Sequence, residues 1–449
     1  VFFPSTARMA ATEGAALKAV KKVRFDGLVF SRYVASCWIV AYHFYGQASW
    51  HGPAPQTGGA GLPPSSRHLA MRFFGWGTFW TQYFFFLSGF VLTTARLTSR
   101  QPDELKPTWR FVADRLTTTY PAYVFALVLM VFDRGDELAM ATKYDWLNFG
   151  LHLTLLQAWW PKMVWTTGTL GGLTGLFHWN TPAWFMSALF FYWLLFKPLY
   201  RGLRLLPSLA LVPAFLGLWA CSSATAIDMR IRNIAPTEAD HNFYRFNPIM
   251  SLHIFVAGMV FARLFAEGKV AVPYSACLGY AACVIAALTV SVEDLCGMTH
   301  SGQDFETGTF YFFHNGGLLP LHALLVSGLC SDLDPLTRLF KRPLGIFLGS
   351  ASYAQYILQA VVFRLVGQAY RAACYRDPEH YHAYPYGPWT WQLVLPATLL
   401  VSALTTHYGL SVPCANHLKT KLDELQAALD KADDVVAAPA DGYGAISKV

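Results

Sequence analysis

The chain has 449 residues, of which 54% are hydrophobic, 16% aromatic and only 14% charged. A soluble domain carries about 25% charged residues, so this composition excludes an ordinary soluble protein and predicts an all-α, polytopic membrane helix bundle. The net charge of +7 does not indicate nucleic-acid binding, because the Lys and Arg residues form short clusters beside apolar runs, as membrane topology requires.

Ten apolar runs reach the length of about 17–25 residues that a helix needs to cross a bilayer. In chain order they lie near residues 28–46, 73–95, 116–133, 183–199, 206–222, 247–266, 273–292, 309–330, 343–364 and 390–412. A shorter run at 146–160 is typical of re-entrant or interfacial segments. We therefore expect a cytoplasmic segment over 1–24, a membrane domain over 25–412 and a cytoplasmic tail with a short amphipathic helix over 413–449.

Positive charge predicts the orientation of these spans. With the Lys/Arg cluster of residues 18–24 in the cytoplasm, ten spans also place most of the later basic clusters there. Counting 146–160 as a further span would invert every later loop. Both termini are therefore predicted to be cytoplasmic, with the membrane itself left open.

The first span contains two ionisable residues, Arg32 and His43. Such residues are costly inside a bilayer and are functional candidates for that reason. Eleven residues of helix advance about 16 Å and return to nearly the same face, so Arg32 is expected near one membrane surface and His43 near mid-bilayer. Two other interpretations stay open: Arg32 could snorkel to the interface, and His43 could be a hydrogen-bonded packing residue.

The first span and four later segments carry recognisable sequence patterns. In chain order, the segments with recognisable patterns are Ser31-Arg32-Tyr33-Val34-Ala35-Ser36 with His43, Tyr83-Phe84-Phe85-Phe86-Leu87-Ser88-Gly89-Phe90, Arg115 with Tyr120-Pro121-Ala122-Tyr123, Trp184-Phe185-Met186-Ser187, and Gly349-Ser350-Ala351-Ser352-Tyr353-Ala354-Gln355-Tyr356. Together and in this order they resemble the acyltransferase type 3 family over roughly residues 25–365. The resemblance implies an integral membrane enzyme that moves acyl groups from a cytoplasmic donor, usually an acyl-CoA, onto hydroxyl or amino acceptors such as glycans.

The chemistry of such a transfer suits the two residues of the first span. A hydroxyl is a poor nucleophile at neutral pH, and a neutral imidazole can take its proton, so His43 is the candidate general base. An arginine near the cytoplasmic surface can bind the phosphates of acyl-CoA, which makes Arg32 and Arg115 candidate donor-binding residues. Arg115 could equally be present only because cytoplasmic loops carry an excess of positive charge.

Other motif residues are expected to line the site. The candidates are Ser88, Trp184, Tyr353 and Gln359. The aromatic run at 83–86 is most simply explained by packing, with Ser88-Gly89 allowing a close helix approach.

Three positions depart from the family pattern. Thr118 stands where many members have a second Arg, Leu189 where many have Glu, and Gln359 where many have His. Loss of Arg and Glu would weaken the grip on phosphate or reorganise the site, whereas Gln359 can still donate and accept hydrogen bonds. These departures leave open whether the chain keeps its activity.

The sequence thus predicts an integral membrane acyltransferase that moves an acyl group, with acetyl favoured, from acyl-CoA to a hydroxyl of a glycan or lipid. Acyl-CoA would be a co-substrate, and no permanently bound cofactor or metal is expected, because the eight cysteines lack metal-ligand spacing. The alternatives are a non-catalytic subunit that keeps the fold and a proton-coupled transporter. Membrane lipids are expected partners, and the leucine pattern over 415–435 could bind a protein.

Overall fold

The computed structural model describes most of the membrane domain and the first part of the tail. Its described residues are 26–43, 72–99, 101–103, 105–135, 141, 143–159, 179–232, 238–270, 272–290, 292, 308–331, 333–374 and 389–437. Every regular element within these ranges is helical. The predicted all-α class is therefore confirmed.

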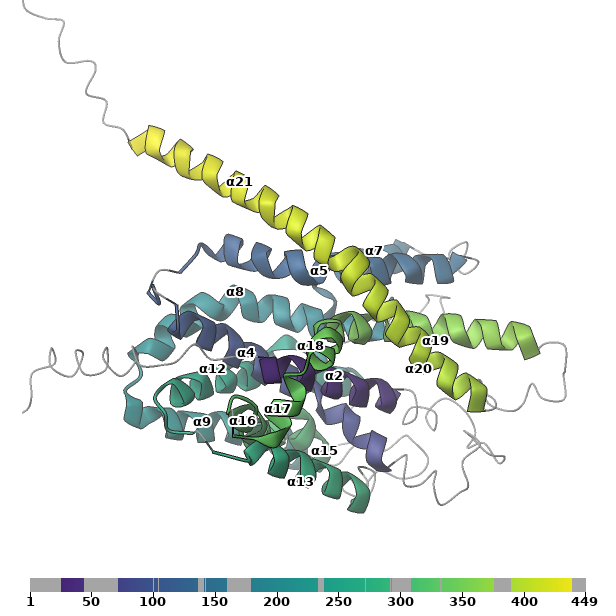
Figure 1. The fold of residues 1–449 in the computed structure, drawn as a ribbon, viewed down its shortest axis with the longest axis horizontal. Helices are drawn as coiled ribbons and strands as arrows, with labels where there is room; N and C mark the ends of the chain where they lie inside the picture. The colour runs from purple at the N-terminus through teal and green to yellow at the C-terminus, as the bar shows by residue number, and fades with distance from the viewer. Residues whose placement is uncertain are drawn as a thin grey trace, which may run out of the picture.

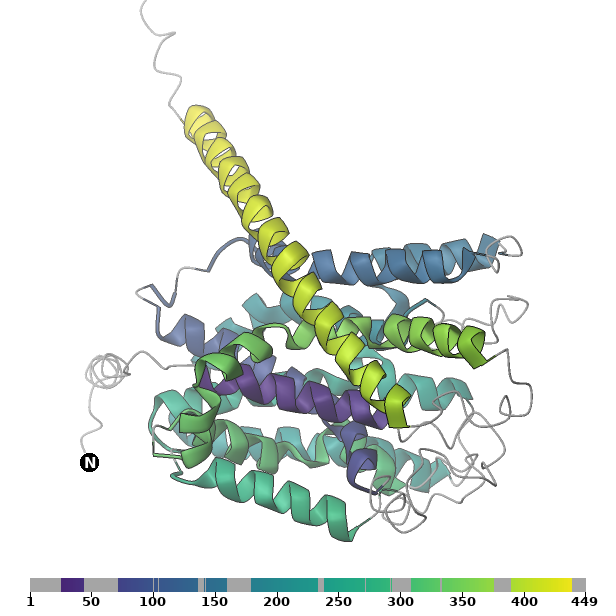
Figure 2. The ribbon, with the colours of Figure 1, turned by 45° about the vertical axis from the view of Figure 1, so that its right-hand side comes forward.

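The α-helices vary widely in length. They are α2 (Asp26–Ala41), α4 (Thr81–Leu97), α5 (Thr108–Asp133), α7 (Lys143–Leu153), α8 (Trp184–Leu205), α9 (Leu211–Ala220), α10 (Ala224–Arg232), α11 (Glu238–Phe246), α12 (Leu252–Ala266), α13 (Ser275–Thr289), α15 (Gly308–Phe312), α16 (Leu319–Leu329), α17 (Pro335–Phe340), α18 (Pro343–Ser350), α19 (Ser352–Cys374), α20 (Trp389–Thr405) and α21 (Val412–Ala437). In two views α2 runs through the middle of the bundle, while α20 and α21 form one long helix that crosses it obliquely and projects beyond it (Figures 1 and 2).

Several helices are suited to a bilayer. Within the described ranges, four are long and apolar enough to cross one, namely Thr108–Asp133, Ser208–Met229, Pro248–Ala266 and Leu393–Lys431, and the bent pair Pro343–Ser350 and Ser352–Ala369 would add a fifth. Each of these five overlaps an expected span. The predicted count of ten is not confirmed, because the helices at the other expected positions are too short or not apolar enough by the same measure.

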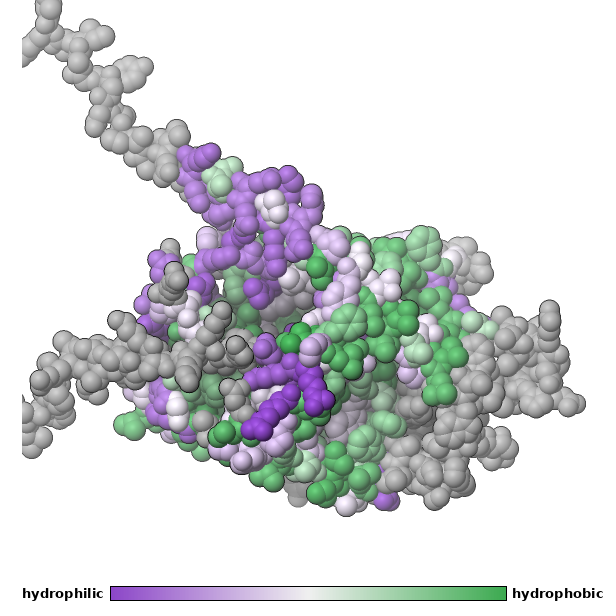
Figure 3. All heavy atoms as spheres, in the orientation of Figure 1, coloured by the Kyte–Doolittle hydropathy of each residue, from purple (hydrophilic) through white to green (hydrophobic). Residues whose placement is uncertain are grey.

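The surface of the bundle agrees with a lipid environment. Large apolar side chains are exposed on it, including Leu209 (90%), Phe132 (77%) and Leu393 (72%). Hydrophobic residues cover much of the bundle face in Figure 3, whereas hydrophilic residues gather on the projecting part of α21. Apolar patches of this kind indicate contact with lipid or another apolar partner, and together with the apolar helices they indicate an integral membrane protein.

Two glycines allow α4 and α12 to approach closely. A Cβ on Gly89 would lie 2.1 Å from the carbonyl oxygen of Phe255, and a Cβ on Gly258 would lie 2.0 Å from that of Phe86. Small residues at a crossing let helix backbones meet in a membrane, where packing replaces the hydrophobic effect as the driving force. The close approach expected at Ser88-Gly89 is thus present.

The helix α7 ends inside the bundle, beside the middle of α5. Two tyrosines of α5, Tyr120 and Tyr123, donate hydrogen bonds to the carbonyls of Leu153 and His152 at the end of α7. These tyrosines lie half-way along α5, so α7 ends at mid-bundle. The helix stops there, and Leu155, two residues later, has a φ of 59°. Trp160 lies outside the described residues, so the re-entrant interpretation of 146–160 stays a prediction.

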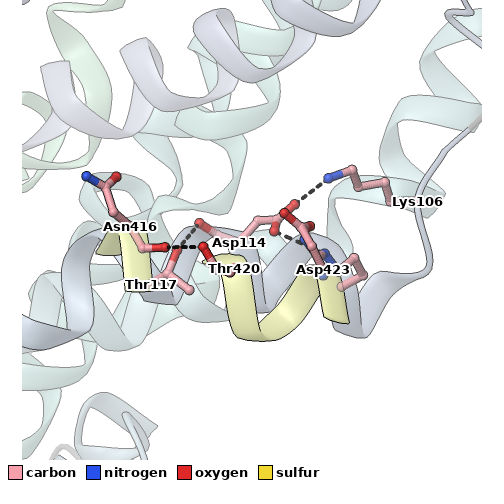
Figure 4. A network of polar contacts seen from close by, with 7 residues as sticks. Lys106, Asp114, Thr117, Asn416, Thr420 and Asp423 are labelled. Carbon is pink, nitrogen blue, oxygen red and sulfur yellow. Dashed lines mark hydrogen bonds and ion pairs between the residues drawn. The ribbon is translucent and has the colours of Figure 1, made fainter. Parts of the chain in front are cut away.

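The first turns of α21 lie against the first turns of α5 (Figure 4). Arg110, whose side chain is 6% exposed, forms an ion pair with Asp423 and lies 3.1 Å from Asp114, which also binds Lys106 at 2.6 Å. The buried arginine is therefore compensated by two carboxylates, one from each helix. A cytoplasmic tail beginning at residue 413 and a protein partner at 415–435 stay predictions.

A single carboxylate caps two helices. Asp334 is fully buried, and its two oxygens accept hydrogen bonds from the amides of Leu336, at the start of α17, and of Ala276, at the start of α13, at 3.0 and 2.9 Å. The first amides of a helix have no partner within it, and the positive end of the helix dipole favours an anion. Asp334 therefore ties the beginnings of α13 and α17 together.

We expect Asp334→Ala to destabilise the protein by about 1–3 kcal/mol, because two buried helix starts lose their acceptor. Asp334→Asn, which keeps one good acceptor oxygen, should lose less. Thermal unfolding of the purified protein in detergent measures the difference. A midpoint for Asp334→Ala equal to that of the parent would contradict the capping role.

Candidate active site

The helix α2 carries both ionisable residues of the first span. Its sequence opens with Asp26 in the first turn, where an acidic residue is favourable, and continues with an apolar run that buries one face. Arg32 lies in its first half and His43 follows its last residue, Ala41, in a short π-helical turn. The spacing along one helix is thus as the sequence predicts.

His43 contacts Gln359 of α19. The Nδ1 atom of His43 and the Oε1 atom of Gln359 are 2.8 Å apart. The amide nitrogen of Gln359 donates a hydrogen bond of 2.8 Å to the carbonyl oxygen of Tyr356, and Gln359 is 1% exposed. The structure therefore brings together two of the predicted site residues, one of them a departure from the family pattern.

The two helices α2 and α19 run parallel in a fixed register. The Ser36 hydroxyl donates to the carbonyl oxygen of Ser352 at 3.2 Å, and the amide of Gln355 donates to the Cys37 sulfur at 3.3 Å. Seven residues, or two helical turns, separate Ser36 from His43, and seven also separate Ser352 from Gln359. The contact between Ser36 and the late Ser-Tyr motif thus places Gln359 and His43 at the same position along the two helices.

The aromatic run of α4 packs on another face of α2. The hydroxyls of Ser31 and Tyr83 are 2.7 Å apart, and Trp38 stacks on Trp80 with ring centres 5.3 Å apart. A Cβ on Gly77 would lie 2.3 Å from the carbonyl oxygen of Trp38, so the glycine permits this contact. Tyr83 is fully buried.

Contacts between aromatic rings connect the Trp184 motif with α4 and α19. The ring centre of Trp184 lies 6.0 Å from that of Phe85 in α4. The ring of Phe185 stacks on the ring of Phe85 with the centres 4.8 Å apart. The ring centre of Phe185 also lies 5.4 Å from that of Tyr356 in α19. The Tyr356 hydroxyl donates to the carbonyl oxygen of Pro182, two residues before α8, at 3.2 Å. Four of the five sequence motifs therefore converge around α2, although they are spread over more than 300 residues.

Arg32 is a cation without a carboxylate nearby in the part of the chain that the structure describes. It makes no hydrogen bond or ion pair with any described residue. Its charge lies close enough to act on Tyr83 and on His407, which belongs to the π-helical turn η13 (Thr406–Ser411) between α20 and α21. Arg32 is partly buried, and a cation withdrawn from water is costly unless a counter-charge reaches it, which makes Arg32 a candidate anion-binding residue.

Other predicted site residues do not join this group. Arg115 lies on α5 with its guanidinium 5.7 Å from the ring centre of Phe111. Ser88 is half-buried on α4, and the buried hydroxyl of Tyr353 has no hydrogen-bond partner among the described residues. No described contact joins any of the three to Arg32 or His43, so their roles stay predictions.

The other two departures from the family pattern have ordinary surroundings. Thr118 is exposed on α5 and bonds the carbonyl oxygen of Arg115, at 2.7 Å. Leu189 is buried in the core of the bundle. Neither therefore adds a charge to the site.

Arg245 is the residue that sequence reasoning missed. It is buried at the end of α11, with its guanidinium 4.8 Å from the ring centre of Phe246 and 5.2 Å from that of Phe310. It hydrogen-bonds Tyr42 and its charge acts on His43. The signal was an arginine at the predicted outer end of a span, which runs against the usual distribution of positive charge.

Among the described residues, no three His, Cys, Asp or Glu side chains are grouped so that they could hold a metal ion.

A family model described as an acyltransferase domain, of acyltransferase type 3, matches residues 25–407. No curated protein and no solved structure matches the chain. The family match covers all the motif segments described above.

Proposed function

This chain belongs to the acyltransferase type 3 family, and from that premise we propose that it transfers an acyl group, with acetyl favoured, from a cytoplasmic acyl-CoA to a hydroxyl of a glycan or lipid. The family implies a membrane acyltransferase. The observation that carries the finer proposal is that one helix presents a base and an uncompensated cation about 16 Å apart.

In the proposed reaction His43 takes the proton from the acceptor hydroxyl as its oxygen attacks the thioester carbonyl carbon. The new C–O bond forms, the C–S bond breaks, and the CoA thiolate leaves with the proton that His43 returns. Arg32 binds a phosphate of the donor. Arg245, beside His43, supplies positive charge where a carbonyl oxygen becomes negative during the transfer.

Two alternatives make different demands on these residues. A non-catalytic subunit would have Arg32 and His43 saturated by neighbouring side chains, yet Arg32 and the Nε2 atom of His43 have no partner within the described ranges. A transporter would have discontinuous helices, and the 50° bend between α18 and α19 is of this kind. A bend alone does not outweigh the family membership, so acyl transfer is favoured.

The proposal is tested by incubating the purified protein with acetyl-CoA and a pool of glycan or lipid acceptors, and by measuring release of free CoA together with acyl transfer. Loss of acyl groups is expected in the parent protein. Absence of turnover with every acyl-CoA and acceptor class would count against an enzyme.

Arg32→Gln should raise the KM for acyl-CoA by roughly 10- to 100-fold, because a charge-assisted hydrogen bond to phosphate contributes about 1.5–3 kcal/mol. The kcat should change much less, and Arg32→Lys should lie between the two. Arg201→Gln, which removes an exposed arginine from the end of α8, is the matched control. An unchanged KM in Arg32→Gln would show that Arg32 does not bind the donor and serves membrane topology alone.

A further inference from the structure

We propose that Gln359 is a positioning residue that fixes the tautomer of His43, so that the Nε2 atom is the base. The inference rests on the proposed function. It follows from two hydrogen bonds of one amide group and from the register of α2 and α19.

The amide of Gln359 has only one orientation that satisfies both of its contacts. Its nitrogen donates to the carbonyl oxygen of Tyr356, which can only accept, at 2.8 Å. The amide oxygen therefore faces the Nδ1 atom of His43, 2.8 Å away. Because an amide oxygen cannot donate, the proton of the neutral imidazole lies on Nδ1.

The other ring nitrogen is then left with its lone pair. In this tautomer Nε2 can take the proton of the acceptor hydroxyl, while the opposite tautomer would place a hydrogen there and block the step. A partner that holds a histidine in one tautomer is a known requirement for base catalysis by imidazole. Gln359 acts through His43 and does not itself touch the reacting atoms.

The surroundings hold Gln359 in place. It follows Tyr356 by one turn, and the Tyr356 hydroxyl bonds Pro182. The amide of Asn180 donates to the carbonyl oxygen of Ile357 at 3.1 Å, which anchors the same turn of α19. On the α2 side, the contact between Ser36 and Ser352 sets the register two turns earlier. Neither partner can slide without breaking these contacts.

The test compares Gln359→Met, which keeps the length of the side chain without an acceptor, with Gln359→Glu, which keeps an acceptor and adds a charge. Gln359→Met should lower kcat by roughly 10- to 100-fold, less than loss of His43 itself, with little change in the KM for acetyl-CoA. Gln359→Glu should stay active, and the acidic limb of its pH profile should move to higher pH by about 1–2 units, because a carboxylate stabilises the imidazolium. Gln426→Met is the matched control, since Gln426 lies on α21 and its amide donates to Asp430 of the same helix at 2.8 Å.

Nitrogen-15 NMR of histidine-labelled protein gives a readout that does not depend on turnover. His43 is assigned from the signal lost in His43→Gln. The parent should show a protonated Nδ1 and a bare Nε2, and Gln359→Met should show a mixture. A parent protein with the proton on Nε2 overturns the inference, as does a Gln359→Met protein with an unmixed tautomer and the parent rate. If the tautomers behave as expected and no acyl-CoA is consumed, the proposed function fails instead.

Discussion

His43→Ala is expected to lower the rate of acyl transfer by about 10²- to 10⁴-fold, the usual contribution of a general base. Binding of acyl-CoA should persist, because Arg32 is untouched and lies about 16 Å away along α2. His43→Gln is the informative companion. It keeps a polar side chain that can bond Gln359, and it cannot take a proton.

The two histidine variants therefore separate catalysis from packing. If His43 served packing alone, the Gln variant would recover most of the activity and the Ala variant would unfold at a lower temperature. If it is the base, both variants are inactive at nearly parental stability. His253→Gln is the control, because His253 is a partly buried histidine that bonds the carbonyl oxygen of Asn315 at 2.8 Å and lies outside α2. It should retain the parent rate to within a few-fold.

The largest effect on folding is expected from Gly258→Ala and Gly89→Ala. The added methyl group would meet a backbone carbonyl at 2.0 or 2.1 Å, and a backbone cannot move aside as a side chain can. Overpacking typically costs about 1–3 kcal/mol, and we expect the upper end of this range or failure to fold. Separation of α4 from α12 would also move Tyr83 away from Ser31.

Gly202→Ala is the matched control for the glycine variants. Gly202 lies inside α8, and a Cβ there meets nothing within 4 Å. Alanine favours helix over glycine by about 1 kcal/mol, so this variant should be neutral or slightly more stable. Thermal unfolding and size-exclusion profiles in detergent measure all three. Equal midpoints for Gly258→Ala and Gly202→Ala would contradict the close helix crossing.

The sequence was a sufficient guide to the helical class and to the residues of α2. Apolar runs and ionisable residues within them are local features, and a helix of known pitch places Arg32 and His43 without further information. The membrane family was also recognisable, because ordered motifs survive where individual residues have changed.

The partner of His43 could not be predicted in the same way. Gln359 lies 316 residues further along the chain, and its pairing depends on the register of two helices, which no local pattern records. The sequence suggested Gln359 as a lining residue and a departure that weakens the family match. In the structure this departure contacts the candidate base directly.

Helix lengths were the other difference. The predicted span 343–364 divides at Ala351 into α18 and α19, and α16 begins only after a kink at Gly316, where φ is 106°. Hydropathy averages over a window and does not detect such breaks. Arg245 was missed for a related reason, because a single arginine in front of an apolar run carries no periodic signal.

The matched spacing of α2 and α19 has a consequence for how the chain tolerates changes in length. A residue inserted between Ser36 and His43 would rotate His43 by about 100° and advance it by about 1.5 Å, so that it would no longer face Gln359. The same holds for an insertion between Ser352 and Gln359. Equal insertions in both helices would turn the two side chains to opposite sides of the interface, so only insertions outside these two intervals would leave the pair intact. We therefore expect relatives of this chain to vary in the length of their loops while both intervals stay at seven residues.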